Sequence, residues 1–229
     1  MTRNALPDAI QHMQAGNLDK ARTTAEGYIE SHPNEPEGLT ILAMILLRSK
    51  DLDTAEAAIR RAILLSPDNA NYQCNLALIL TERDMEQAAI EAYQQALRIN
   101  PHIAEAFLNL SILQRKQGKL EDAIKSCRQA TSIRPGFVQA HNTLGNILRD
   151  SGESESAITE YKHAIHTQPD NFLSHLNLAG VLLDMDRYDE AYSAYKIVLK
   201  LNPESEDVYR GIAQCLKALG KTGEAIIYA

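Results

Sequence analysis

Asparagine side chains recur in this sequence at a spacing that suits the binding of another polypeptide. Asn75 and Asn109 are 34 residues apart, Asn177 lies two such intervals beyond Asn109, and Thr143 occupies the intervening place. A carboxamide carries both a hydrogen-bond donor and an acceptor. A row of these residues can therefore pair with the N–H and C=O groups of an extended peptide, whatever the side chains of that peptide are.

Two arginines form a second group of candidate binding residues. Arg115 and Arg149 are also 34 residues apart, and Arg149 closely follows Asn142 and Asn146. In a chain with a formal net charge of -7, guanidinium groups beside amides predict attraction for the carboxylates of a ligand. The alternative is an ordinary solvated face, on which acidic neighbours such as Asp150 neutralise the arginines.

The spacing of 34 residues extends along the whole chain and is marked most clearly by proline. The prolines that mark it are Pro33, Pro67, Pro101, Pro135, Pro169 and Pro203. When each repeat is counted from the third residue after a proline, its eighth and twentieth positions hold only small residues, and its seventh and eleventh are mostly leucine. These apolar spacings are those of helical faces. A fixed period of this size predicts helix pairs that bury their apolar faces against the next pair.

The ends of the expected helices can also be located within the repeat. The first helix should run for about fourteen residues and end at the fifteenth position, where glycine recurs and can adopt the left-handed conformation that closes a helix. Lys50, Asp84 and Asp186 hold this position in three repeats. The second helix should continue to the residue before each proline, because proline cannot extend a helix.

Aromatic residues complete the pattern, since Tyr93, Tyr161 and Tyr195 share the twenty-fourth position of their repeats. Together with the small residues and the closing prolines, they resemble the signature of the tetratricopeptide repeat (TPR) family over essentially the whole chain. The resemblance implies an all-α fold, a right-handed superhelical solenoid of antiparallel helix pairs. It also implies that the chain binds other proteins, although a fold alone names no partner.

The expected domain organisation is a single array over residues 2–229. Its repeats are expected at 2–35, 36–69, 70–103, 104–137, 138–171, 172–205 and, incomplete, 206–229. The first is expected to be an N-terminal cap, because Asp8 and His12 stand where later repeats have leucine and a terminal repeat needs a polar outer face. Stacking should line up positions two, five, six, nine, twelve and thirteen of the first helices on one concave surface.

The asparagine row is similar to the one in the TPR arm of O-linked N-acetylglucosamine transferases, where such residues hold the substrate backbone. The match covers Asn75, Asn109 and Asn177, and Thr143 interrupts it. The alternative is that these amides only solvate the inner wall or bridge neighbouring helices.

Composition excludes several other classes of function. The acidic balance, with a pI near 5.5, argues against nucleic acid as a partner. The apolar runs are too short to span a membrane, and the first residues do not form a signal peptide. Three widely separated cysteines suit neither disulfides nor zinc and favour a cytoplasmic location. No motif predicts a catalytic residue, a metal site or a cofactor.

Three functions therefore remain open. The leading hypothesis is a non-enzymatic scaffold that recruits an extended segment of a protein along its concave face. The alternative is the substrate-recruiting N-terminal arm of a larger glycosyltransferase, sulfotransferase or methyltransferase whose catalytic domain lies beyond residue 229, since the last repeat stops within its second helix. The third is self-association through that uncapped end, where Ile226, Ile227 and Tyr228 would have little to pack against.

Overall fold

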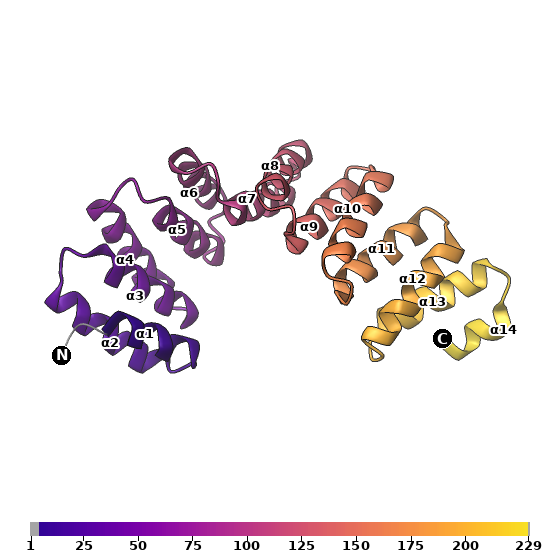
Figure 1. The fold of residues 1–229 in the computed structure, drawn as a ribbon, viewed down its shortest axis with the longest axis horizontal. Coiled ribbons are helices and arrows are strands. Elements are labelled where there is room, and N and C mark those ends of the chain that lie inside the picture. Colours follow the sequence, from indigo (N-terminus) through magenta and orange to yellow (C-terminus); the bar gives the residue numbers. More distant parts are fainter. Residues whose placement is uncertain (1–4, 229) are drawn as a thin grey trace. The chain divides into compact units, whose positions relative to one another are not determined.

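The chain folds into consecutive helix pairs that follow the 34-residue period. The computed structural model describes residues 5–228, which contain helices and turns but no strand (Figure 1). The first helices of the pairs are α1 (Ala5–Gln14), α3 (Pro36–Arg48), α5 (Ala70–Glu82), α7 (Ala104–Lys116), α9 (Val138–Asp150), α11 (Phe172–Asp184) and α13 (Glu206–Ala218). The second helices are α2 (Leu18–Ser31), α4 (Leu52–Leu65), α6 (Glu86–Ile99), α8 (Leu120–Ile133), α10 (Ser154–Thr167), α12 (Tyr188–Leu201) and the short α14 (Thr222–Ala225), which continues into the 3-10 turn Ile226–Tyr228. The predicted all-α class is confirmed.

The helices form two compact units, with the boundary inside α7. The N-terminal unit extends to Ala106, and the C-terminal unit begins at Phe107. Within each unit, second helices pack against the following first helices, as α2 does against α3 and α10 against α11. A single array over residues 2–229 stays a prediction, and residues 2–4 and Ala229 of that range lie outside the described residues.

The small residues at the eighth and twentieth positions are buried, as their size predicts. The alanines at the twentieth position, from Ala21 to Ala225, have no exposed surface. Gly145, at the eighth position of α9, shows why size is restricted there. A Cβ atom at Gly145 would lie 2.4 Å from the ring of Tyr161, which is itself fully buried. Close packing of the two helices of a pair therefore depends on these small side chains.

The predicted ends of the first helices are confirmed. The glycines at the fifteenth position have positive φ angles, and Lys50, Asp84 and Asp186 share this conformation with φ of 63°, 57° and 59°. The second helices end one residue earlier than predicted. For example, α4 ends at Leu65 and Ser66 leaves the helix with φ of -144° and ψ of 81°, because a residue that precedes proline is excluded from the α conformation.

Candidate peptide-binding surface

One face of α3 carries none of the buried residues of that helix. In α3 the buried residues are Gly38, Leu39, Leu42, Ala43, Ile45 and Leu46. The positions they leave, namely two, five, six, nine, twelve and thirteen, lie on the same side of the helix. We call this set of positions the first-helix stripe. Neighbouring first helices contact each other, as α3 does α5 and α9 does α11, and an ion pair between Arg115 and Asp150 links α7 to α9, so their stripes adjoin.

The asparagine row lies at the centre of the stripe, at the sixth position. Asn75 belongs to α5 of the N-terminal unit, whereas Asn109, Thr143 and Asn177 belong to α7, α9 and α11 of the C-terminal unit. All four side chains are half-buried. Within residues 5–228, none of these four side chains makes a hydrogen bond, so no bridge to a neighbouring helix occupies their donors and acceptors.

The two other candidate asparagines are engaged in packing. Asn142 donates a hydrogen bond to Oγ of Ser174 (2.7 Å) and thereby links α9 to α11. Asn146 accepts a hydrogen bond from the hydroxyl of Tyr161 (2.7 Å), which links α9 to α10. Burial raises the pKa of Tyr161 to about 12, so this hydroxyl keeps its proton. Asn142 and Asn146 therefore hold helices together, in contrast to the row at the sixth position.

The two candidate arginines are paired with acidic residues of the next repeat. Nε of Arg115 lies 2.5 Å from Asp150, and Nε of Arg149 lies 2.7 Å from Asp184. The Arg149 guanidinium also covers Gly180, where an added Cβ would meet Nη1 at 3.5 Å. These pairs are well exposed, so each stabilises the fold by at most about 1 kcal/mol. Their geometry matches the alternative in which acidic neighbours neutralise the arginines.

A histidine near the start of α9 has a structural role. His141 is buried, with Nδ1 2.7 Å from the Glu160 carboxylate and Nε2 2.8 Å from the Pro135 carbonyl oxygen. Since both partners accept hydrogen bonds, the ring is best satisfied when both nitrogens carry protons. The hydrogen bond to Glu160 accordingly raises the pKa of His141. The signal in the sequence is the repetition at His175, whose Nε2 lies 2.7 Å from the Pro169 carbonyl oxygen.

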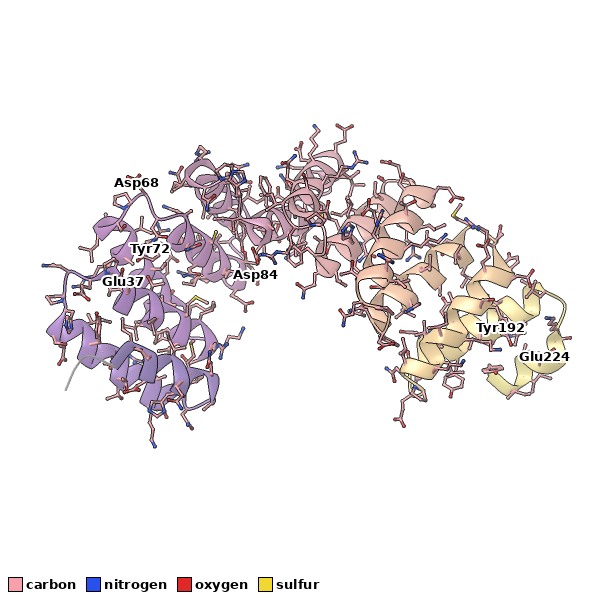
Figure 2. All side chains as sticks on the ribbon, in the orientation of Figure 1. Glu37, Asp68, Tyr72, Asp84, Tyr192 and Glu224 are labelled. Carbon is pink, nitrogen blue, oxygen red and sulfur yellow. The ribbon has the colours of Figure 1, made fainter. Side chains whose placement is uncertain are left out.

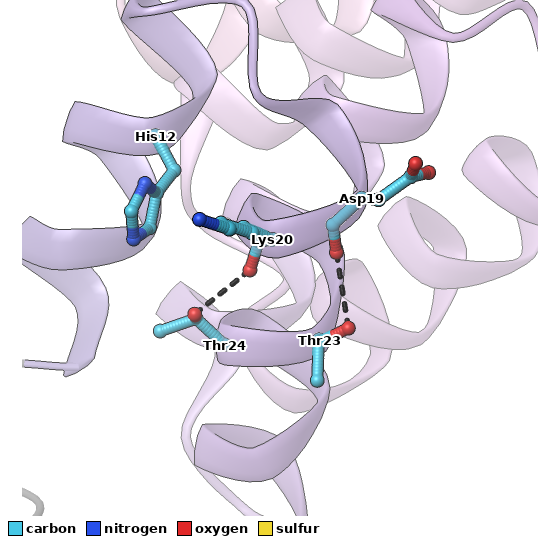
Figure 3. Close-up of a pocket in the computed structure, with 5 residues that line it drawn as sticks. All are labelled: His12, Asp19, Lys20, Thr23 and Thr24. Carbon is cyan, nitrogen blue, oxygen red and sulfur yellow. Dashed lines mark hydrogen bonds between the residues drawn. The ribbon is translucent and has the colours of Figure 1, made fainter.

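A hollow beside α1 and α2 offers no chemistry of its own. His12, Asp19, Lys20, Thr23 and Thr24 line it (Figure 3). The two threonine hydroxyls donate to the backbone carbonyls of Asp19 (3.0 Å) and Lys20 (2.8 Å) and are therefore occupied. Over the described part of the chain, no group of three or more His, Cys, Asp or Glu side chains is placed to hold a metal ion. None of the helices described combines the length and apolar character needed to cross a membrane.

Comparison with family models identifies the family. Models described as "Tetratricopeptide repeat" match residues 8–82 and 87–136, residues 70–103 and residues 182–227, and one described as "TPR repeat" matches residues 145–186. The model that matches 8–82 and 87–136 spans more than half of the chain. The chain belongs to the tetratricopeptide repeat family.

Solved structures share the fold at low sequence identity. PilW, described as a widely conserved type IV pilus biogenesis factor, has a TM-score of 0.81 and 20% identity, over 91% of this chain and 97% of that one. YrrB, described as a TPR protein with an unusual peptide-binding site, has a TM-score of 0.68 and 16% identity over 81% and 96%. The APC/C hetero-tetramer Cut9–Hcn1 has a TM-score of 0.71 and 17% identity over 96% and 44%. A search of curated proteins found no match.

Proposed function

We propose that this protein is a non-enzymatic scaffold that holds an extended segment of a partner protein against Asn109, Thr143 and Asn177. The observation that carries the proposal is that these half-buried side chains lie on adjoining stripes and make no hydrogen bond within the described residues. Each amide can pair with one peptide group of a ligand and stabilise the complex by about 1 kcal/mol. The same use of asparagine in the arm of O-linked N-acetylglucosamine transferases supports this mode of binding.

Two structural relatives support a polypeptide as the ligand. YrrB is described as having a peptide-binding site, and Cut9–Hcn1 is a complex of two different proteins. The three cysteines, Cys74, Cys127 and Cys215, are free thiols, which supports the cytoplasm as the proposed location.

The test compares the affinity of a defined peptide for the native chain and for amide variants. Peptides selected from a random 12-residue display library on the whole protein serve as the probes, and fluorescence polarisation gives Kd. The double variant Asn109→Ala, Asn177→Ala should weaken binding by about tenfold or more, because two hydrogen bonds are lost. Gln129→Ala is the matched control, since Gln129 is an exposed carboxamide on α8 of the same unit. Unchanged affinity of a folded double variant would contradict the proposal.

We propose self-association as a second function, on a separate observation. Ile226 and Ile227 are 75% and 76% exposed, next to Tyr228, whose ring lies 6.0 Å from that of Tyr209. Neighbouring exposed apolar side chains of this size are typical of interaction sites. Light scattering should then show a mass above 25.4 kDa that rises with protein concentration and falls in the variant Ile226→Ser, Ile227→Ser. A concentration-independent monomer would exclude this second function.

A further inference from the structure

Part of the first-helix stripe of the N-terminal unit is apolar. Its positions six, nine and twelve carry Asn75 and Thr81 on α5, but also six half-buried apolar residues on α1, α3 and α5, namely Ile10, Met13, Ile41, Met44, Leu47 and Leu78. We call these six residues the apolar wall. Because α1 contacts α3 and α3 contacts α5, the six side chains belong to one continuous surface.

Two hydroxyl groups beside the wall are already satisfied, whereas the carboxamide of Asn75 makes no hydrogen bond within residues 5–228. The hydroxyl of Thr40 donates to the carbonyl oxygen of Pro36 (2.9 Å), and that of Thr81 donates to the carbonyl oxygen of Ala77 (2.8 Å). Neither threonine needs a hydrogen-bonding partner from outside. The wall therefore favours apolar groups of a ligand over polar ones.

This character is not a general property of the repeats. In the C-terminal unit the same three positions include Asn109, Arg115, Asn146, Arg149 and Asn177. The helical framework is the same in the two units, so the framework does not require apolar residues there. Half-exposed Ile, Leu and Met side chains gathered on one surface are typical of an interaction site.

Carboxylates flank the apolar wall at the second position of the stripe. Figure 2 labels Glu37, at the start of α3, and Tyr72 of α5. Burial raises the pKa of Tyr72, and so does the negative charge of Glu37, because this carboxylate lies near α5. In the same way, burial and the charge of Glu105 raise the pKa of Cys74 to about 11. The carboxylate of Glu37 thus lies beside the part of the wall formed by α3 and α5.

Of two nearby cations, Lys50 is paired with a carboxylate, and Arg48 keeps its charge while it binds a backbone carbonyl. Nζ of Lys50 lies 2.5 Å from the Glu82 carboxylate, and Nη1 of Arg48 donates to the carbonyl oxygen of Met13 (3.0 Å). Over residues 1–106, acidic residues outnumber Lys and Arg by fifteen to nine. The N-terminal unit therefore attracts cationic ligands and repels anionic membranes and nucleic acids.

We propose that the apolar wall docks a cationic amphipathic segment of a partner protein. Apolar side chains of that segment pack on Ile41, Met44 and Leu78, and its lysines or arginines face Glu37. This inference rests on the proposed function and deepens it, because it names the chemistry of the partner. It concerns the N-terminal unit, whereas the amide row of Asn109 and Asn177 belongs to the C-terminal unit, so the two can be tested separately.

The test uses a random 12-residue peptide library displayed on phage and selected on the whole protein. Selected peptides should combine Leu, Ile, Met or Phe with Lys or Arg. Met44→Asp should weaken the binding of the tightest synthetic peptide by about tenfold or more, although the added negative charge attracts a cation. Leu64→Asp is the matched control, since Leu64 on α4 is 81% exposed and outside the wall; it should leave Kd unchanged. Glu37→Gln should weaken binding by about a few-fold at low salt and less at high salt.

Circular dichroism confirms that each variant is folded, and Met44→Gln replaces Met44→Asp if the charge prevents folding. Selection of acidic or purely polar peptides, or of none, would overturn the inference. So would an unchanged Kd in a folded Met44 variant. If the Asn109→Ala, Asn177→Ala variant loses binding while the wall variants keep it, the wall inference fails and the amide proposal stands. If the wall variants lose binding while the Asn109→Ala, Asn177→Ala variant keeps it, the amide proposal fails and the wall inference stands.

Discussion

Two glycines in neighbouring first helices should respond oppositely to the same substitution. At Gly145 an added Cβ would lie 2.4 Å, 2.8 Å and 2.8 Å from three atoms of the Tyr161 ring. At Gly180 the nearest atom is Nη1 of Arg149 at 3.5 Å, an ordinary contact with a flexible side chain. Alanine stabilises a helix interior by about 0.5–1 kcal/mol relative to glycine, and overpacking a core costs about 1–3 kcal/mol.

The sum of these two effects decides the sign at each position. Gly145→Ala should lower the free energy of unfolding by about 1–2 kcal/mol, because Tyr161 is fully buried and its hydroxyl is bound to Asn146, so the ring cannot move away freely. Gly180→Ala should raise it by about 0.5–1 kcal/mol. Urea unfolding followed by circular dichroism at 222 nm measures both. If Gly145→Ala stabilises the protein as much as Gly180→Ala, the close helix contact inferred at Gly145 is wrong.

Further predictions concern the core, the histidine and a helix end. Leu144→Ala should destabilise the fold by about 2–5 kcal/mol in the same assay, because Leu144 is 1% exposed and its loss leaves a cavity; a change below about 0.5 kcal/mol would contradict this packing. The raised folded-state pKa of His141, due first to Glu160, means that its contribution to stability is complete below the unfolded pKa of about 6.5. That contribution should be lost as the pH rises through the folded pKa. Between about pH 6 and 8, the urea concentration at the unfolding midpoint should therefore fall more for the native chain than for His141→Gln. Parallel pH profiles of the two proteins would refute this role of His141. Lys50→Gly should stabilise the fold by up to about 1 kcal/mol, because φ is 63° at Lys50 and a left-handed residue other than glycine is strained. Gly118→Ala, where φ is 74°, should destabilise it by a similar amount, and a loss of stability in Lys50→Gly would count against the argument.

The features of the fold that depend on local chemistry could be predicted from the sequence. The left-handed conformation of Lys50 and Asp186 follows from their alignment with glycines such as Gly118, because the same turn must close every first helix. The pattern of prolines predicts that α4 ends at Ser66, but it ends one residue earlier, at Leu65. The difference arises because proline also restricts the residue that precedes it.

The candidate surface was less predictable, because side chains at equivalent positions have different partners. Asn146 and Asn177 are both amides on the stripe, yet only Asn146 has a tyrosine hydroxyl within reach. That distinction depends on the side-chain rotamer and the burial of Tyr161. The 34-residue period of the sequence does not determine either of them. The apolar wall cannot be recognised from the sequence, because residues such as Met44 and Leu78 match the apolar character expected of helix faces that pack. Only their half-exposure in the structure separates them from the core.

The central claim is that side-chain amides of the C-terminal unit bind the backbone of an extended segment. The most direct measurement follows the side-chain amide resonances of asparagine by NMR while a library-selected 12-residue peptide is added to the whole protein. We expect saturable shifts for Asn109 and Asn177, and little change for Asn146, whose Oδ1 accepts a hydrogen bond from Tyr161 at 2.7 Å. A peptide that binds tightly and leaves the Asn109 and Asn177 resonances in place would contradict it.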